Sequence, residues 1–253
     1  MANKRYSRIH WTANIQGGDY PMSGLLAPAL KEGAWRVVAI PGTPSRDHVF
    51  YRFLAKAPED MEVAMVSRAG YGPKTGEPVL DFDEQVRSIA PLFTKDDGRK
   101  TIILGVSYGG ALSLKCALDY PDHIVGALTV AMLVNEPRAY VRASLPLALL
   151  PGIKQILPKH LHNARQEVAG RRAQIGPLFD RLKTLDIPVT ILHGDADTLV
   201  PLQAAHDLKA HFTEEQDVQF SLVKRGSHYL ECERPNRLYE EIEGLKARIE
   251  QNV

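Results

Sequence analysis

The chain has 253 residues, which is enough to bury a large core and fits a single α/β domain that carries an insertion. Its 31 basic and 30 acidic side chains leave a formal net charge of +1, which excludes a strong electrostatic case for binding nucleic acid. Two cysteines are too few for a disulfide framework, and we find no secretory signal and no apolar run long enough to span a membrane, so we expect a soluble cytoplasmic protein with reduced thiols.

Short apolar runs alternate with helical patterns along most of the chain. Residues 7–30 predict an antiparallel hairpin that turns at Gly17 and Gly18. Six further strands are expected at residues 35–40, 63–66, 101–104, 124–130, 187–192 and 218–223. Helices are expected at residues 46–57, 81–92, 111–118, 202–211 and 238–249. Because strands alternate with helices, the pattern predicts an α/β fold with a mostly parallel, twisted sheet and helices on both faces.

Residues 132–186 interrupt this alternation. They contain several prolines, short helical patterns and no convincing strand, and they carry nine basic side chains against four acidic ones. We expect a helical lid, or cap, inserted into a core formed by residues 1–131 and 187–253. The basic excess is most simply a solvated surface. A carboxylate-bearing substrate is the alternative, with Arg46 as the charge to follow near the pocket.

The segment around Ser107 has the pattern of a sharp strand-to-helix turn, because Gly105, Ser107 and Gly109 form a G-x-S-x-G motif between a buried strand and an apolar helix. Such a turn strains its middle residue and exposes the serine hydroxyl, while the glycines avoid collisions with the neighbouring backbone. The motif alone would match a chain of this length by chance in roughly one case in ten. A plain glycine-rich turn is therefore the alternative. The strand before the motif, the helix after it and the partners downstream favour a nucleophilic serine over that alternative.

A serine hydroxyl becomes a good nucleophile only when a base takes its proton, and the base needs an orienting carboxylate. Of nine histidines, His228 is the best placed, because it follows the strand expected at residues 218–223. The loop after residues 187–192 offers two carboxylates, Asp195 and Asp197. Both loops follow the carboxyl ends of strands, where parallel sheets bind their ligands.

The order of these residues resembles that of the α/β-hydrolase family, in which the serine is followed along the chain by the acid and then by the histidine. The acid loop is similar to the family's Gly-x-x-Asp-x-x-Val-Pro pattern, which here runs from residue 194 to residue 201. Matching this pattern residue by residue assigns the acid to Asp197. Asp195 is left with the loop-capping role that aspartate often has in turns.

Two further segments carry the resemblance. Residues 67–72 are similar to the family's Asp-Arg-Pro-Gly-Tyr-Gly loop, from which they depart at two positions. Residues 228–235 are similar to the family's His, then Glu, then Pro before the last helix. The resemblance covers residues 30–131 and 187–253, and it implies the α/β-hydrolase fold while saying little about the substrate.

Attack on a carbonyl places negative charge on its oxygen, and each fixed amide aimed at that oxygen contributes about 10²- to 10³-fold in rate. One donor is expected to be the amide of Tyr108, next to the nucleophile at the start of the helix. The other is expected to be Thr43, because Pro44 has no N–H. The family more often has His-Gly where this chain has Pro41 and Gly42, so a side chain that often braces this loop is missing.

We therefore predict a cofactor-free serine hydrolase that cleaves a carboxylic ester of a small to medium substrate through Ser107, His228 and Asp197, by way of an acyl-enzyme. This choice of substrate is an analogy with the scaffold. A carbon–carbon bond hydrolase, a thioesterase, an aminopeptidase and an acyltransferase would use the same triad. A non-catalytic ligand-binding protein is the alternative of a different class, and the complete set of triad residues disfavours it.

An aminopeptidase would need acids in the insertion to hold the substrate amine, and the insertion is basic. His193 and the two aspartates that follow it form no complete ligand cluster, so we expect no metal. The physiological substrate and the oligomeric state stay open.

Overall fold

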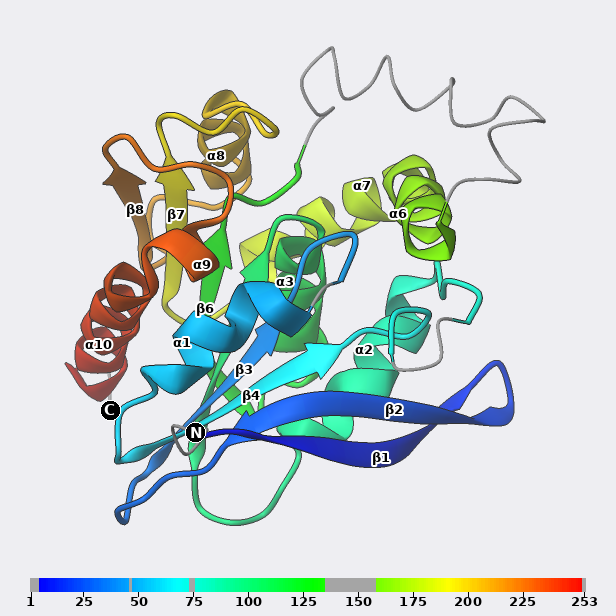
Figure 1. The fold of residues 1–253 in the computed structure, drawn as a ribbon. Helices are drawn as coiled ribbons and strands as arrows, with labels where there is room; N and C mark the ends of the chain where they lie inside the picture. The colour runs from blue at the N-terminus through cyan, green and yellow to red at the C-terminus, as the bar shows by residue number, and fades with distance from the viewer. Residues whose placement is uncertain (1–4, 46, 73–75, 135–157, 252–253) are drawn as a thin grey trace.

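The structure is a computed structural model of the chain, and it describes residues 5–45, 47–72, 76–134 and 158–251. One eight-stranded sheet runs through the molecule in the order β1-β2-β4-β3-β5-β6-β7-β8 (Figure 1). The strands are β1 (Ser7–Ile15), β2 (Gly18–Ala27), β3 (Trp35–Ile40), β4 (Met61–Ser67), β5 (Lys100–Val106), β6 (Ile124–Val130), β7 (Val189–Gly194) and β8 (Val218–Val223).

The sheet is mixed, as the sequence predicts. β1 and β2 form an antiparallel hairpin at one edge, and β2 pairs antiparallel with β4. Every pairing from β4 across to β8 is parallel. The carboxyl ends of these six strands therefore lie at the same edge of the sheet, and their loops can build one site.

Helices cover both faces of the sheet, and the sheet divides the apolar core into two clusters (Figure 1). Along β3 the buried side chains alternate, since Val38 and Ile40 belong to one apolar cluster whereas Val37 and Ala39 belong to the other. The first cluster includes side chains from α2 (Phe82–Ile89), α3 (Tyr108–Asp119), α7 (Arg172–Arg181) and α8 (Gln203–Lys209). The second includes side chains from α1 (Tyr51–Ala55), α9 (Leu230–Glu233) and α10 (Pro235–Gln251).

The expected insertion is described only in part. It contains α6 (Lys159–Gly170), α7 and a short 3-10 helix at Leu182–Thr184. Residues 135–157 lie outside the described residues, as does Arg46. The boundaries of the insertion and its role as a lid therefore stay predictions.

The hairpin and the six later strands are confirmed. Three of the strands, at residues 35–40, 124–130 and 218–223, match at both ends, and the ends of the others differ by up to three residues. The helix after Ser107 begins at Tyr108, three residues earlier than expected, because β5 continues to Val106 and leaves only Ser107 for the turn. The helix expected at residues 46–57 is shorter in its described part and begins with a 3-10 turn at Asp47–Phe50. None of the described helices is long and apolar enough to cross a membrane.

Candidate active site

Ser107 forms the turn between β5 and α3. Its backbone has φ 54° and ψ −118°, outside the regions that a residue other than glycine adopts without strain. The two glycines of the motif make room for this turn. A Cβ on Gly109 would collide with the carbonyl oxygens of Ile40 and Pro41, and a Cβ on Gly105 would collide with the carbonyl of Gly109. The strained turn thus occupies the sheet edge where the sequence places a nucleophile.

Asp197 and His228 meet beyond the ends of β7 and β8, because Nδ1 of His228 lies 2.7 Å from Oδ2 of Asp197. The other carboxylate oxygen accepts hydrogen bonds from the amides of Leu199 and Val200, at 2.7 and 2.9 Å. Burial alone would raise the pKa of Asp197, but the hydrogen bond from His228 and the two amides hold it below its ordinary value. Asp197 is therefore an ionised group that orients the imidazole.

Asp195 and His193 have other partners. Asp195 is exposed and accepts a hydrogen bond of 2.5 Å from the amide of Arg225, which ties two loops together. His193 is buried, and its Nε2 lies 3.2 Å from the carbonyl oxygen of Val200 and 3.6 Å from Oδ2 of Asp197. Burial lowers the pKa of His193, which keeps the ring neutral. Among the residues that the structure describes, no group of three or more side chains is arranged to hold a metal ion.

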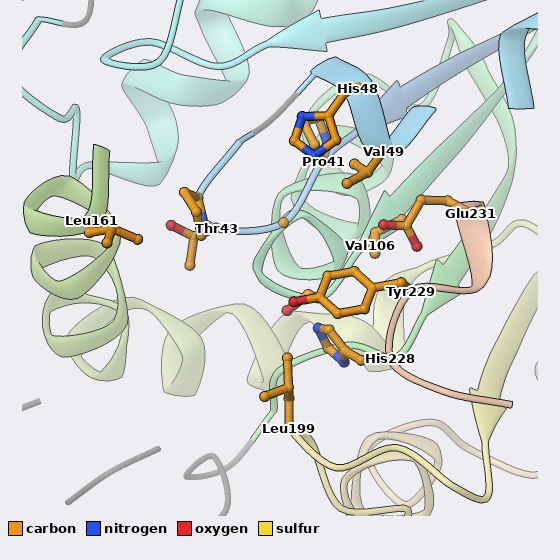
Figure 2. Close-up of a pocket in the computed structure, with 13 residues that line it drawn as sticks. Pro41, Thr43, His48, Val49, Val106, Leu161, Leu199, His228, Tyr229 and Glu231 are labelled. Carbon is orange, nitrogen blue, oxygen red and sulfur yellow. The ribbon is translucent and has the colours of Figure 1, made fainter. Parts of the chain in front are cut away.

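Ser107 and His228 line the same pocket, which has a volume of about 360 Å³. Thr43 lies at one side of it with Leu161 of α6, and Glu231 lies at the opposite side of the view (Figure 2). The remaining lining residues are Pro41, Gly42, Pro44, His48, Val49, Val106, Leu199 and Tyr229. The pocket thus combines a polar centre with apolar walls, as a site for an acyl group requires.

The loop after β3 packs directly against Ser107, since a Cβ on Gly42 would lie 2.9 Å from the Cβ of Ser107. Thr43 follows Gly42 in this loop, and the amide of Tyr108, the residue after Ser107, is the first of α3. Within the described part of the chain, neither amide donates a hydrogen bond to another group. Two amides without partners beside a serine can receive an oxyanion.

Comparison with known proteins identifies the family. A model of the alpha/beta hydrolase family matches residues 37–241. The chain belongs to this family and is a hydrolase. The pimeloyl-[acyl-carrier protein] methyl ester esterase of Proteus mirabilis (strain HI4320) is 24% identical to this hydrolase over 234 residues, which cover 79% of this chain and 88% of that protein. The enzyme of the same name from Aliivibrio fischeri (strain ATCC 700601 / ES114) is 25% identical over 210 residues, covering 68% and 79%.

Solved structures of low sequence identity share the fold of the hydrolase. A peroxisomal alpha-beta-hydrolase from Saccharomyces cerevisiae matches it with a TM-score of 0.73 at 13% identity, over 99% of this chain and 91% of that one. A thermophilic esterase from Thermogutta terrifontis matches with a TM-score of 0.68 at 15% identity, over 96% and 99%.

Two charged residues of the hydrolase's site received no role from the sequence. Arg68 is buried behind the loop after β3, and the segment that contains it was noted only for its resemblance to the family. Glu231 lines the pocket and is 3% exposed, and its Oε2 has no hydrogen-bond partner among the described residues. Burial raises the pKa of Glu231 to about 8. Its position three residues after His228 was the only signal in the sequence.

Proposed function

We propose that this hydrolase is a serine esterase in which Ser107 is the nucleophile, His228 the base and Asp197 the acid that orients the base. The observation that carries the proposal is the 2.7 Å contact between His228 and Asp197 in a pocket that Ser107 also lines. An ionised carboxylate on Nδ1 keeps a proton on that nitrogen and leaves Nε2 to accept the serine proton.

In the first half-reaction, Oγ of Ser107 attacks the ester carbonyl while His228 takes the hydroxyl proton. The carbonyl oxygen becomes an oxyanion and accepts hydrogen bonds from the amides of Thr43 and Tyr108. The intermediate then expels the alcohol, which takes the proton from His228, and leaves an acyl group on Ser107. In the second half-reaction, water attacks the acyl carbon while His228 takes its proton. The resulting intermediate then breaks its bond to Oγ of Ser107, which regains a proton from His228, and the carboxylic acid leaves.

The pocket supports a small to medium acyl group as the part of the substrate that the enzyme recognises. Its volume of about 360 Å³ suits such a group, and Leu161 and Leu199 supply apolar contacts. Leu161 belongs to α6, so the insertion contributes to the pocket as a cap would. The curated relatives are named as methyl ester esterases, which favours an alkyl ester of an acyl chain as the substrate.

Other acyl and carbon–carbon hydrolases would use the same three side chains, and the names of the relatives favour ester cleavage over them. A ligand-binding protein without turnover would not need an orienting acid on His228. The cytoplasmic location, the absence of a nucleic-acid partner and the absence of a cofactor stay predictions from the sequence.

A fluorophosphonate probe followed by peptide mapping tests the proposal. We expect covalent labelling of Ser107 that disappears in His228→Ala. Ser107→Ala should lower kcat toward p-nitrophenyl esters by about 10⁴- to 10⁶-fold. Asp197→Asn should lower it by roughly 10³- to 10⁴-fold, because the imidazole loses its orienting charge.

Asp195→Asn is the matched control. Its kcat should stay within threefold of the wild-type value, because the carboxylate of Asp195 accepts a hydrogen bond from the Arg225 amide and does not orient His228. Methyl and p-nitrophenyl esters of increasing acyl length would define the substrate. Loss of less than tenfold in Ser107→Ala would exclude Ser107 as the nucleophile.

A further inference from the structure

Arg68 lies behind the proposed oxyanion hole, directly after β4, and is 1% exposed. Its guanidinium donates two hydrogen bonds to the loop after β3. Nε donates to the carbonyl oxygen of Pro41 at 3.0 Å, and Nη2 donates to the carbonyl oxygen of Gly42 at 2.8 Å. One side chain therefore holds two consecutive carbonyl groups of this loop.

The bond to Gly42 also sets the direction of the proposed oxyanion donor. The carbonyl of Gly42 and the N–H of Thr43 belong to the same peptide unit, which is planar. This unit is trans, since the cis bond of the loop is the following one, Thr43–Pro44. In a trans unit the two groups point in opposite directions. When Arg68 holds the carbonyl of Gly42, it therefore directs the N–H of Thr43 away from itself.

Arg68 also contacts two tyrosine rings, one of a proposed donor residue and one of a residue that binds the other donor residue. Its guanidinium carbon lies 4.7 Å from the ring centre of Tyr108 and 5.1 Å from that of Tyr71. The hydroxyl of Tyr71 lies 2.9 Å from Oγ1 of Thr43. The side chain thus touches Tyr108 directly and reaches Thr43 through the loop backbone and through Tyr71.

Glu167 of α6 holds Arg68 from the side of the insertion. Both of its carboxylate oxygens bind the guanidinium, one to Nη1 and the other to Nη2 at 2.9 Å, and the second also accepts from the hydroxyl of Tyr71 at 2.8 Å. Glu167 is fully buried. Burial alone would lower the pKa of Arg68, but the charge of Glu167 reverses this and holds the pKa above its ordinary value.

We propose that Arg68 is the positioning residue of the oxyanion hole. Through its ion pair with Glu167, the geometry of this hole depends on how α6 packs against the core. The proposal rests on the proposed function, in which the Thr43 amide binds the oxyanion. It also accounts for Pro41, where the family more often has histidine, because the brace of the loop comes here from another strand.

A purely structural ion pair would stabilise the fold without favouring the transition state. The two roles differ in their effect on a trifluoromethyl ketone, which forms a tetrahedral adduct with the nucleophile and places its oxyanion in the hole. Loss of positioning weakens this adduct and lowers kcat/KM, because the adduct and the acylation transition state both place negative charge in the hole. Loss of stability alone lowers the melting temperature and leaves the affinity of the folded enzyme unchanged.

The test measures kcat and KM for p-nitrophenyl butyrate and Ki for the ketone in Arg68→Met, Glu167→Gln and Tyr71→Phe. For Arg68→Met we expect kcat/KM to fall about 10- to 10³-fold and Ki to rise by the same factor. Glu167→Gln and Tyr71→Phe should show the same pattern with smaller changes, because each removes only part of the brace.

Two further variants keep the test decisive. In Arg68→Met/Glu167→Met both charges are removed together, which avoids an unpaired buried charge and favours folding, yet the two loop carbonyls still lose their donor. Arg36→Met is the matched control. Arg36 is also fully buried and pairs with Glu62 and Asp97, but it lies near the amino end of β3, away from the site. We expect this variant to melt earlier and to keep the wild-type Ki.

A Ki and kcat/KM within threefold of the wild type in a folded double variant would overturn the proposal. An equal rise of Ki in Arg36→Met would also overturn it. Activity that persists in Ser107→Ala would overturn the proposed function and this inference together, whereas an unchanged Ki in an enzyme that depends on Ser107 overturns the inference alone.

Discussion

Two buried carboxylates near His228 show how the partners of a single residue decide its charge. Asp197 accepts hydrogen bonds from His228 and from two amides, and its pKa is held below the ordinary value. Glu231 is as deeply buried, but its Oε2 has no described partner, and burial raises its pKa to about 8. Desolvation acts on both groups, and hydrogen bonds to the charged form reverse it only for Asp197.

This difference predicts a pH-dependent stability. Between pH 4.5 and pH 8, Glu231 is ionised in the unfolded chain but protonated in the folded one, so the free energy of unfolding falls as the pH rises. At 1.36 kcal/mol per pKa unit, the loss reaches at most about 5 kcal/mol. Glu231→Gln removes this titration, so the melting temperature of the variant relative to the wild type should increase from pH 5 to pH 8.

Circular dichroism melts at the two pH values measure the effect. Glu233→Gln is the control, because Glu233 is exposed in the same short helix. A difference between Glu231→Gln and the wild type that is the same at both pH values would contradict the prediction.

At the scale of elements, the site depends on three segments that approach each other more closely than side chains allow. The turn at Ser107, the first residues of α3 and the loop after β3 touch through glycines. A Cβ on Gly109 would lie 2.7 Å from the carbonyl oxygen of Pro41 and closer still to that of Ile40. Both neighbours are backbone atoms, one at the end of β3 and one in the loop that follows, so a shift of either would displace the Thr43 amide.

We therefore expect Gly109→Ala to lower both the melting temperature and kcat, the latter by at least tenfold, because the loop must shift away from Ser107. Gly244→Ala in α10 is the matched control. Nothing lies within 4 Å of the added methyl group at Gly244, and alanine favours a helix over glycine by roughly 0.5–1 kcal/mol. The control should melt at the same or a higher temperature with unchanged kcat, and a Gly109→Ala variant with wild-type kcat would refute the close-contact argument.

At the scale of the whole molecule, α6 and α7, which belong to the predicted insertion, are held against the core by buried contacts. The side-chain amide of Asn163 in α6 donates to the carbonyl oxygens of Gly70 and Gly76, both at 3.0 Å. Gln174 in α7 accepts from the amide of Phe82 at 2.6 Å, and apolar side chains of α7 join the core cluster. These helices are therefore not attached through their connections alone.

From these contacts we expect one cooperative thermal transition for the insertion and the core together. Differential scanning calorimetry should give a single peak in which the calorimetric enthalpy equals the van't Hoff enthalpy. Asn163→Ala and Glu167→Gln should shift this peak to lower temperature without splitting it. A separate early transition would indicate that the insertion unfolds independently of the core.

The sequence by itself determined most of the fold and the candidate triad. Runs such as residues 35–40 and 124–130 are apolar because central parallel strands are buried on both faces, and this pattern is visible without coordinates. The spacing of Gly105, Ser107 and Gly109 is equally local, since a strand-to-helix turn of this kind leaves room for no other residue at the outer two positions.

Only the tertiary structure decided which buried groups meet behind the site. Arg68 and Glu167 are 99 positions apart, and no local pattern links a residue after β4 to a residue on α6. The same holds for Glu231, whose protonation depends on its burial and on the lack of a described hydrogen-bond partner for Oε2. Local patterns report the period and the turn of one segment, whereas a buried polar contact depends on how distant segments pack, and packing is a property of the folded chain alone.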